Sequence, residues 1–267
     1  MRHTTTKSSA RRGERLVRKP SRNRKRPNYR LIISCFFMSV VLSSAITYAF
    51  RTPNLDVKNV NIQGVGMCDK QLVKKYADSM YGKNILSVRK SSVCSAIMVL
   101  NEVESVKIGR DFPDKMWVQV TERKPDAVVT DGTKRMLMQD DGLMFHRVDR
   151  PVSGIPLIKI SDFQVLQPGK IANSDQVCCA LDIVKIAKVK KLKVDKISID
   201  HDGDICLNMV SGFYVKLGQP DDISRKMSLL QSALEYRPSL AREAIYIDLS
   251  CPSAPVWKPK VVAQNAS

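Results

Sequence analysis

The sequence is poor in the residue patterns that most catalytic and metal sites need. It has three histidines, His3, His146 and His201, and none lies at ligand spacing from a cysteine. Its seven cysteines form no C-x-x-C pair, and no serine stands in a Gly-x-Ser-x-Gly turn. Ser153 and Cys251 are candidate nucleophiles without a nearby histidine in the sequence. We therefore expect no cofactor, no metal and no enzymatic activity.

One acidic segment imitates a calcium loop. Residues 200–204 read Asp-His-Asp-Gly-Asp, but the glycine is fourth instead of sixth, and Ser211 stands where a bidentate glutamate is needed. The segment separates two alternating apolar runs, 197–199 and 205–207. An Asp-Gly pair in that setting is typical of a hairpin turn, and we expect a tight turn here.

The sequence has one long run without charge, and this run lies near the N-terminus. Leu31 to Phe50 is about as long as a helix that crosses a bilayer, where every backbone group must be bonded internally. The flanking residues 1–30 contain 12 Lys and Arg and one acid, Glu14. Positive flanks stay in the cytoplasm. We expect a single-pass type II protein of the inner membrane, with the tail inside and the C-terminal bulk in the periplasm.

Two other interpretations of the N-terminal region stay open. A signal peptide could be cleaved after Thr47-Tyr48-Ala49, although signal h-regions are shorter than this apolar run. The tail, residues 1–30, has too few apolar residues to fold and is expected to be disordered. Its charge could bind nucleic acid, but no aromatic residue interleaves it for base stacking. We favour attraction to anionic lipid and expect no nucleic acid.

Six cysteines follow the apolar run that contains Cys35. They are Cys68, Cys94, Cys178, Cys179, Cys206 and Cys251. Their spacing does not show whether any of them pair. We expect most to be buried as small apolar side chains, with Cys178 and Cys179 on different faces of a helix.

Residues 57–125 alternate between strand and helix spacing. An apolar strand pattern ends at Gly64, where glycine allows a positive φ. A helical pattern follows to Met80, and a second helix is expected after Ser87, which can cap it. Two alternating runs joined by a turn at Phe112-Pro113-Asp114 complete the segment. This order predicts an α+β unit, with helices on one face of a small sheet.

Residues 126–258 are expected to form a β-rich domain with flanking helices, followed by a tail at 259–267. Hairpin turns are predicted at Asp131-Gly132, Asp141-Gly142 and Asp202-Gly203. Helices are predicted over Cys178 to Lys188 and after Asp221-Asp222, and a late strand over Ile245, Ile247 and Leu249.

Short motifs follow one another in a specific order. They are Gly64; Gly82 to Leu86; Val103-Glu104-Ser105-Val106; Arg110-Asp111-Phe112-Pro113-Asp114; and Val120 to Ala127, with Glu122, Arg123 and Pro125. In this order they resemble the POTRA domain of the bacterial cell-division family FtsQ, also called DivIB. Asp140 to Phe145 is similar to the strand that opens the family's β-rich second domain, and Gly154 to Ile158 to its Leu-Pro turn. The chain departs from the family pattern at Asn101-Glu102-Val103.

The resemblance implies a divisome protein that links early and late division proteins at the septum. Its implied partners are FtsB-like and FtsL-like proteins, other divisome components and the membrane. In the family, the last strand of the second domain is an edge that accepts a partner strand. Tyr246 to Leu249 fits the closing motif, but Ser250-Cys251 replaces its Arg-Tyr. The expected partner-binding residues are Ile245, Tyr246, Ile247, Asp248, Leu249, Cys251, Val256 and Trp257.

Two alternatives remain at this point. Ile247, Leu249 and Trp257 could each simply pack in the core. A membrane-tethered POTRA protein that assists transport or assembly of envelope polypeptides would also use strand addition. The chain has one POTRA-like unit and no long C-terminal barrel pattern, so we favour the division role.

Overall fold

The computed structural model describes residues 29–164 and 167–260 of the 267-residue chain. Most of the expected basic tail and most of the expected C-terminal tail lie outside the described residues. The chain divides into two units, residues 1–51 and 52–267.

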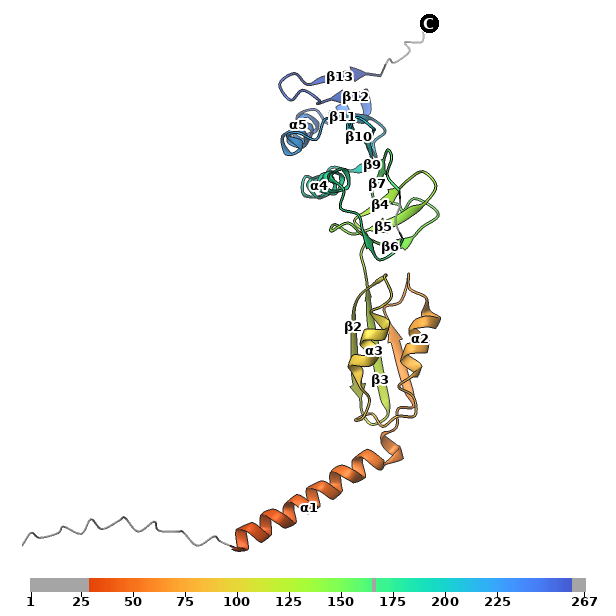
Figure 1. The fold of residues 1–267 in the computed structure, drawn as a ribbon. Helices are drawn as coiled ribbons and strands as arrows, with labels where there is room; N and C mark the ends of the chain where they lie inside the picture. Colours follow the sequence, from red (N-terminus) through yellow and green to blue (C-terminus); the bar gives the residue numbers. More distant parts are fainter. Residues whose placement is uncertain (1–28, 165–166, 261–267) are drawn as a thin grey trace, which may run out of the picture. The chain divides into compact units, whose positions relative to one another are not determined.

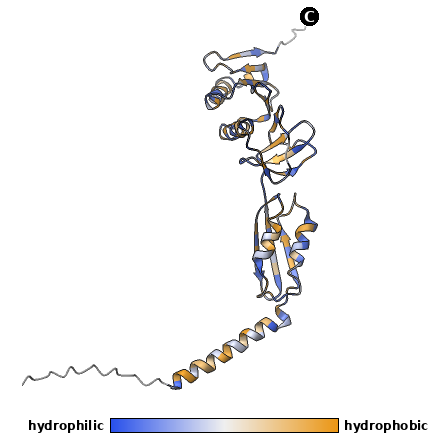
Figure 2. Ribbon diagram, in the orientation of Figure 1, coloured by the Kyte–Doolittle hydropathy of each residue, from blue (hydrophilic) through white to orange (hydrophobic). Residues whose placement is uncertain are grey.

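In the first unit, the described residues form the helix α1 (Tyr29–Arg51), which includes the predicted apolar run. Its 23 residues span about 34 Å at 1.5 Å per residue, against about 30 Å of bilayer hydrocarbon. In Figure 2 the ribbon of α1 has the colour of hydrophobic residues along most of its length. The hydroxyls of Ser39, Ser44 and Thr47 donate to helix carbonyls three or four residues back. By length and composition α1 can cross a membrane.

In the second unit, a 3₁₀ turn (Pro53–Leu55) precedes a three-stranded sheet with two helices (Figure 1). Its elements are β1 (Asn59–Gln63), α2 (Lys70–Asp78), α3 (Lys90–Ile97), β2 (Val103–Asp111) and β3 (Lys115–Glu122). The predicted order of strand, helix, helix, strand, strand is confirmed. β3 lies in the middle, parallel to β1 and antiparallel to β2. Helix residues Val73, Ala77 and Ile97 share a core with Met116 and Val118 of β3.

The starts of α2 and α3 differ. The Asp69 carboxylate accepts a hydrogen bond from the Gln71 N–H and caps α2. Arg89 precedes α3 without a side-chain cap. The prediction that Ser87 caps this helix is wrong, because its hydroxyl donates to the Asn84 carbonyl inside the preceding turn.

The following β-rich region forms one ten-stranded sheet, in the order β13-β12-β11-β10-β9-β7-β4-β5-β6-β8. Its strands are β4 (Ala127–Thr130), β5 (Arg135–Met138), β6 (Leu143–Arg147), β7 (Leu157–Ile160), β8 (Lys170–Ile171), β9 (Val194–Ile199), β10 (Ile205–Met209), β11 (Tyr214–Gly218), β12 (Ala244–Asp248) and β13 (Val256–Pro259). Its helices are α4 (Asp175–Val189), α5 (Ile223–Tyr236) and α6 (Leu240–Glu243). The three predicted Asp-Gly turns join β4 to β5, β5 to β6 and β9 to β10. The region opens with β4, however, and not with the strand after Asp141-Gly142.

The two faces of this sheet differ. α4 and α5 lie on one face (Figure 1), and residues such as Ile183 and Leu230 share the main core with the strands. On the other face, Val128, Leu137 and Phe145 form a small cluster, and the loop residues Val148, Val152 and Ile155 pack against it. Farther along that face, toward β13, the strands carry exposed or half-exposed polar side chains.

Candidate partner-binding edge

The strand predicted to be the free edge lies inside the sheet. β12 is parallel to β11 on one side and antiparallel to β13 on the other. Ile247 is opposite both Val215 and Trp257 and is buried. The prediction placed Ile245–Leu249, together with Val256 and Trp257, on the edge. Val256 and Trp257 do lie on the outermost strand, but Ile245–Leu249 lies one strand inward, because the chain turns back after β12 and continues as β13. Leu249 is also buried, and its N–H donates to the Lys216 carbonyl at 2.8 Å.

The free edge is β13, which no other strand in the described residues flanks on its outer side. Val256 is 58% exposed and Trp257 is 36% exposed. Pro255 precedes the strand and Pro259 ends it, so this edge offers few N–H donors. In the turn before β13, the Asp248 carboxylate accepts the Ser250 N–H at 3.0 Å.

Trp257 lies on the same side of the sheet as Val215 and Ile247, the side that α5 covers. The Arg237 guanidinium, just past the end of α5, lies 5.1 Å from the centre of the Trp257 ring. This is cation–π geometry. The edge therefore presents an aromatic anchor beside a positive charge.

The opposite face beside the edge is aromatic and basic. The rings of Tyr246 and Tyr214 are stacked, with 5.4 Å between their centres. The Lys216 amine lies 5.0 Å from the Tyr246 ring centre, and Lys258 is opposite Tyr246 on β13. Ile245 on β12 is half-buried. This face can contact acidic and aromatic groups of a bound chain.

Cys251 lies in the turn between β12 and β13, where it is exposed. A hydrogen bond with the Ser253 hydroxyl, 3.2 Å away, lowers the pKa of this thiol. Cys68 is buried near Glu122, and burial with this negative charge raises the pKa of its thiol to about 12. All seven cysteines are free. Of the six after α1, only Cys68 is buried, so the expectation that most are buried is wrong.

The motif residues of the three-stranded unit lie away from this edge and hold backbone in place. Arg110 on β2 reaches the loop between α2 and α3. Its Nε donates to the Ile85 carbonyl at 2.7 Å, and its Nη2 donates to the carbonyls of Leu86 and Val88 at 3.4 and 3.1 Å. One side chain thus satisfies three backbone carbonyls of an irregular loop.

Glu122 at the end of β3 holds the loop before α2. Its carboxylate accepts the N–H groups of Gly66, Met67 and Cys68 at 2.8 Å. Burial raises the pKa of Glu122, but the N–H donors of Cys68, Met67 and Gly66 outweigh burial, and the net pKa is lowered. Gly64, with a φ of +81°, sits so close to β3 that a Cβ would lie 2.1 Å from the Val120 carbonyl oxygen.

Arg123 connects three segments. Its Nε donates to the Asn101 carbonyl at 2.9 Å and its Nη1 to the Gln139 side chain at 2.7 Å. Its backbone N–H donates to the Glu102 carbonyl. Pro125 follows two residues later, before β4.

The turn between β2 and β3 contains the rest of the motif. Phe112 is exposed and Pro113 follows it. The Asp114 carbonyl accepts the N–H of Lys58 at 2.9 Å and so ties this turn to the start of β1. Gly64, Arg110, Asp114, Glu122 and Arg123 of the motif therefore each hold backbone segments of this domain together.

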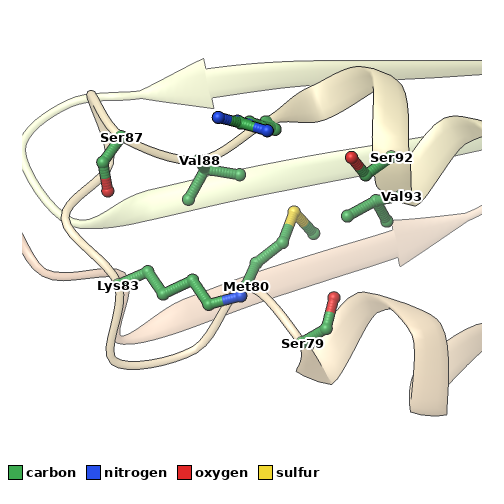
Figure 3. Close-up of a pocket in the computed structure, with 8 residues that line it drawn as sticks. Ser79, Met80, Lys83, Ser87, Val88, Ser92 and Val93 are labelled. Atoms are coloured by element: carbon green, nitrogen blue, oxygen red, sulfur yellow. The ribbon is translucent and has the colours of Figure 1, made fainter.

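A small pocket of about 300 Å³ lies between the end of α2 and the start of α3. Figure 3 shows Lys83 extending toward Met80 across this hollow. Its lining is Ser79, Met80, Lys83, Ser87, Val88, Arg89, Ser92 and Val93. The lining contains no acid and no histidine.

The described residues contain no cluster of three or more His, Cys, Asp or Glu that could hold a metal. The segment that imitates a calcium loop is the predicted tight turn. There the Asp200 carboxylate accepts the N–H groups of Asp202 and Asp204. His146 and His201 contact Glu102 and Asp162, and not the candidate nucleophiles.

Comparison with known proteins finds cell division proteins similar to this chain. The family model for the FtsQ-type POTRA domain matches residues 55–123. The chain is 25% identical to the cell division protein FtsQ of Streptomyces bingchenggensis, over 89% of each protein. It is 23% identical to the FtsQ of Streptomyces coelicolor, over 94% of this chain and 97% of the relative. It is 20% identical to the cell division protein DivIB of Clostridium botulinum, over 90% of this chain and 94% of the relative.

Among solved structures, the chain is similar to the major extracytoplasmic domain of DivIB from Geobacillus stearothermophilus. That match has a TM-score of 0.30 and 13% identity, and it covers 44% of this chain and 98% of that one. Residues 55–123 thus match the FtsQ-type POTRA domain, and the chain is similar over most of its length to cell division proteins named FtsQ and DivIB.

Proposed function

We propose that this chain is a non-enzymatic cell-division protein that holds partner proteins at the septum through the edge strand β13. One observation carries the proposal: in a chain whose relatives are cell division proteins, the second sheet ends in an exposed strand with an aromatic anchor. Such an edge accepts a strand of another protein, and Trp257 supplies the kind of large contact that often dominates interfaces.

The proposed partners are FtsB-like and FtsL-like division proteins, through which the chain connects early and late members of the divisome. Val256 and Trp257 on β13 make the first contacts. Tyr246 and Lys258 make contacts on the open face beside them. Because β12 lies inside the sheet, Ile247 and Leu249 have a supporting role: their buried side chains keep β12 in the sheet.

The proposed topology follows from α1 and the charge that precedes it. α1 spans the inner membrane once, with residues 1–28 in the cytoplasm and residues 52–267 in the periplasm. A protease added to intact spheroplasts should degrade the region after Arg51 and spare the tail. A mature protein that begins near residue 50 and washes off the membrane would show a cleaved signal peptide instead.

The edge is tested with Val256→Asp and Trp257→Ala in the full-length chain. Both should reduce capture of an FtsB-like partner by at least about tenfold and weaken midcell localisation of a fluorescent fusion. Val189→Asp is the matched control, because Val189 is 83% exposed at the end of α4, away from β13. Wild-type capture by both edge variants, with the sheet still folded, would overturn the proposal.

A further inference from the structure

The open face of the three-stranded sheet carries one aromatic side chain among amides. The strand pairings arrange nine positions in three rows: Asp111, Lys115 and Asn59; Gly109, Trp117 and Asn61; Lys107, Gln119 and Gln63. Trp117 occupies the centre and is 38% exposed. The alternate residues of β3, such as Met116 and Val118, face α2 and α3 on the other side.

Gly109 makes room for the indole. A Cβ on Gly109 would lie 2.0, 2.1 and 2.3 Å from three atoms of the Trp117 ring system. Gly109 does not have a positive φ, so the indole, and not the backbone conformation, requires glycine here. The ring is held against the backbone of β2 and leaves part of its surface open to solvent.

Amide side chains line the hollow around this ring. The hollow has a volume of about 540 Å³, and Asn59, Asn61, Gln63 and Gln119 contribute to its lining. None of these four amides bonds to another side chain or backbone group of the described residues. Each offers both donors and an acceptor. The charged lining residues, Asp111 and Lys115, are opposite each other and cancel in net charge.

We propose that this hollow binds a neutral carbohydrate chain, with one pyranose ring stacked on Trp117. A sugar ring has a flat C–H face that suits the negative face of an aromatic ring. Its hydroxyl or acetamido groups are donors and acceptors, which the surrounding amides match. The site lies on the POTRA sheet and is independent of the β13 edge.

Other ligand classes fit this face poorly. A nucleic acid or an acidic polymer requires a basic surface, whereas Asp111 and Lys115 cancel here and Lys107 is the one unbalanced charge among the nine positions. A docked amphipathic helix requires an apolar groove, but Trp117 is the only apolar side chain among the nine positions. Pairing of β3 on both sides also leaves no free strand edge at Trp117.

The test uses the full-length chain in lipid nanodiscs, because common detergents carry sugar groups. Two neutral probes, N-acetylchitohexaose and cellohexaose, are titrated by calorimetry and distinguish acetylated from unacetylated chains. The chain has two tryptophans, so a Trp257→Phe variant makes Trp117 the sole tryptophan reporter. Saturable binding of either probe, with a change in Trp117 fluorescence, is expected.

Trp117→Ala should weaken binding by about tenfold or more, and Trp117→Phe should restore part of the affinity. Asn61→Ala and Gln119→Ala should each weaken binding by about two- to tenfold. Trp257→Ala is the matched control, with similar exposure in the wild type, and should bind normally. Absence of saturable binding to the wild type, or equal binding by Trp117→Ala, overturns the proposal. A third outcome also overturns it: Trp117→Ala binds the sugar normally but no longer captures a protein partner. That result would identify this face as a protein interface.

Discussion

The POTRA sheet and the ten-stranded sheet each expose one tryptophan to nearly the same extent, 38% for Trp117 and 36% for Trp257. Their settings are opposite. Trp117 lies at the centre of a sheet face, against Gly109 and among uncharged amides. Trp257 lies on an edge strand beside Arg237. Exposure alone therefore says little about a surface, and the neighbouring groups decide which chemistry it suits.

The two regions also hold their backbones differently. In the POTRA domain, long charged side chains bond to loop carbonyls and N–H groups, as Arg110 and Glu122 do. The ten-stranded region depends mainly on apolar packing between its sheet and two helices. Replacing single charged residues should therefore lower the free energy of unfolding strongly in the first region. Replacing residues at the exposed edge of the second region should change it little.

Arg110→Ala should have the largest effect on stability. It removes the partner of the carbonyls of Ile85, Leu86 and Val88, and should cost about 3 kcal/mol. The measurements are thermal unfolding of the full-length chain and hydrogen exchange in the loop between α2 and α3. Arg225→Ala, at an exposed position of α5, is the control and should change little. Equal effects of the two changes would contradict the difference between the regions.

Glu122→Gln should cost about 1–2 kcal/mol, because a neutral amide accepts three N–H groups less well than a carboxylate. The lowered pKa of Glu122 also predicts a pH dependence. Its contribution should be present above about pH 4.3, the ordinary glutamate value, and should be lost as the pH falls through the lower folded-state pKa. Denaturant unfolding at several pH values measures both effects. A variant with the same acid sensitivity as the wild type would show that another group causes it.

Gly109→Ala should cost about 1 kcal/mol or more, because the added methyl group displaces the Trp117 indole. The double variant Gly109→Ala/Trp117→Ala should lose this extra cost, since the clash no longer exists. A double-mutant cycle of unfolding free energies measures the coupling. Additive effects would mean that Gly109 is needed for a reason unrelated to the indole.

Val256→Asp should have the smallest effect on stability, within about 0.5 kcal/mol, because the side chain is exposed on the edge strand. This variant is still expected to lose partner capture. Unfolding of the full-length chain, measured beside the capture assay, separates the two properties. A large loss of stability would show that β13 supports the fold more than its exposure indicates.

Local signals in the sequence predicted many elements correctly. The uncharged run identified α1, and Asp-Gly pairs marked three hairpin turns. The change from helical to alternating spacing predicted the order of elements in the POTRA domain. Each of these signals depends on residues close together in the sequence, where periodicity and turn chemistry act directly.

Strand neighbours could not be predicted in the same way. The alternation of Ile245, Ile247 and Leu249 indicated a strand, but it does not show which strands lie beside it. β12 is internal because α5 and α6 carry the chain to a position next to β11, and because the chain then returns as β13. Such pairings depend on contacts between residues far apart in the sequence.

The buried Lys226 was missed for a similar reason. Its amine donates to the Gln219 carbonyl and to the Asp221 carboxylate, both at 2.9 Å, from a position with no exposed side-chain surface. In the sequence it is one lysine in a helix with polar neighbours. Only the path of the chain before α5 provides the two acceptors that make its burial tolerable.

The parallel pairing of β1 with β3 has a mechanical consequence. The chain enters the POTRA domain at the start of β1 and leaves it at the end of β3, and five residue pairs join these two strands. Tension between the two ends would pull the neighbouring strands in opposite directions along their length. Their hydrogen bonds would then share the force in shear, instead of opening one after another. If such a chain were anchored at one end and bound at the other, this domain would be a connector that resists stretching.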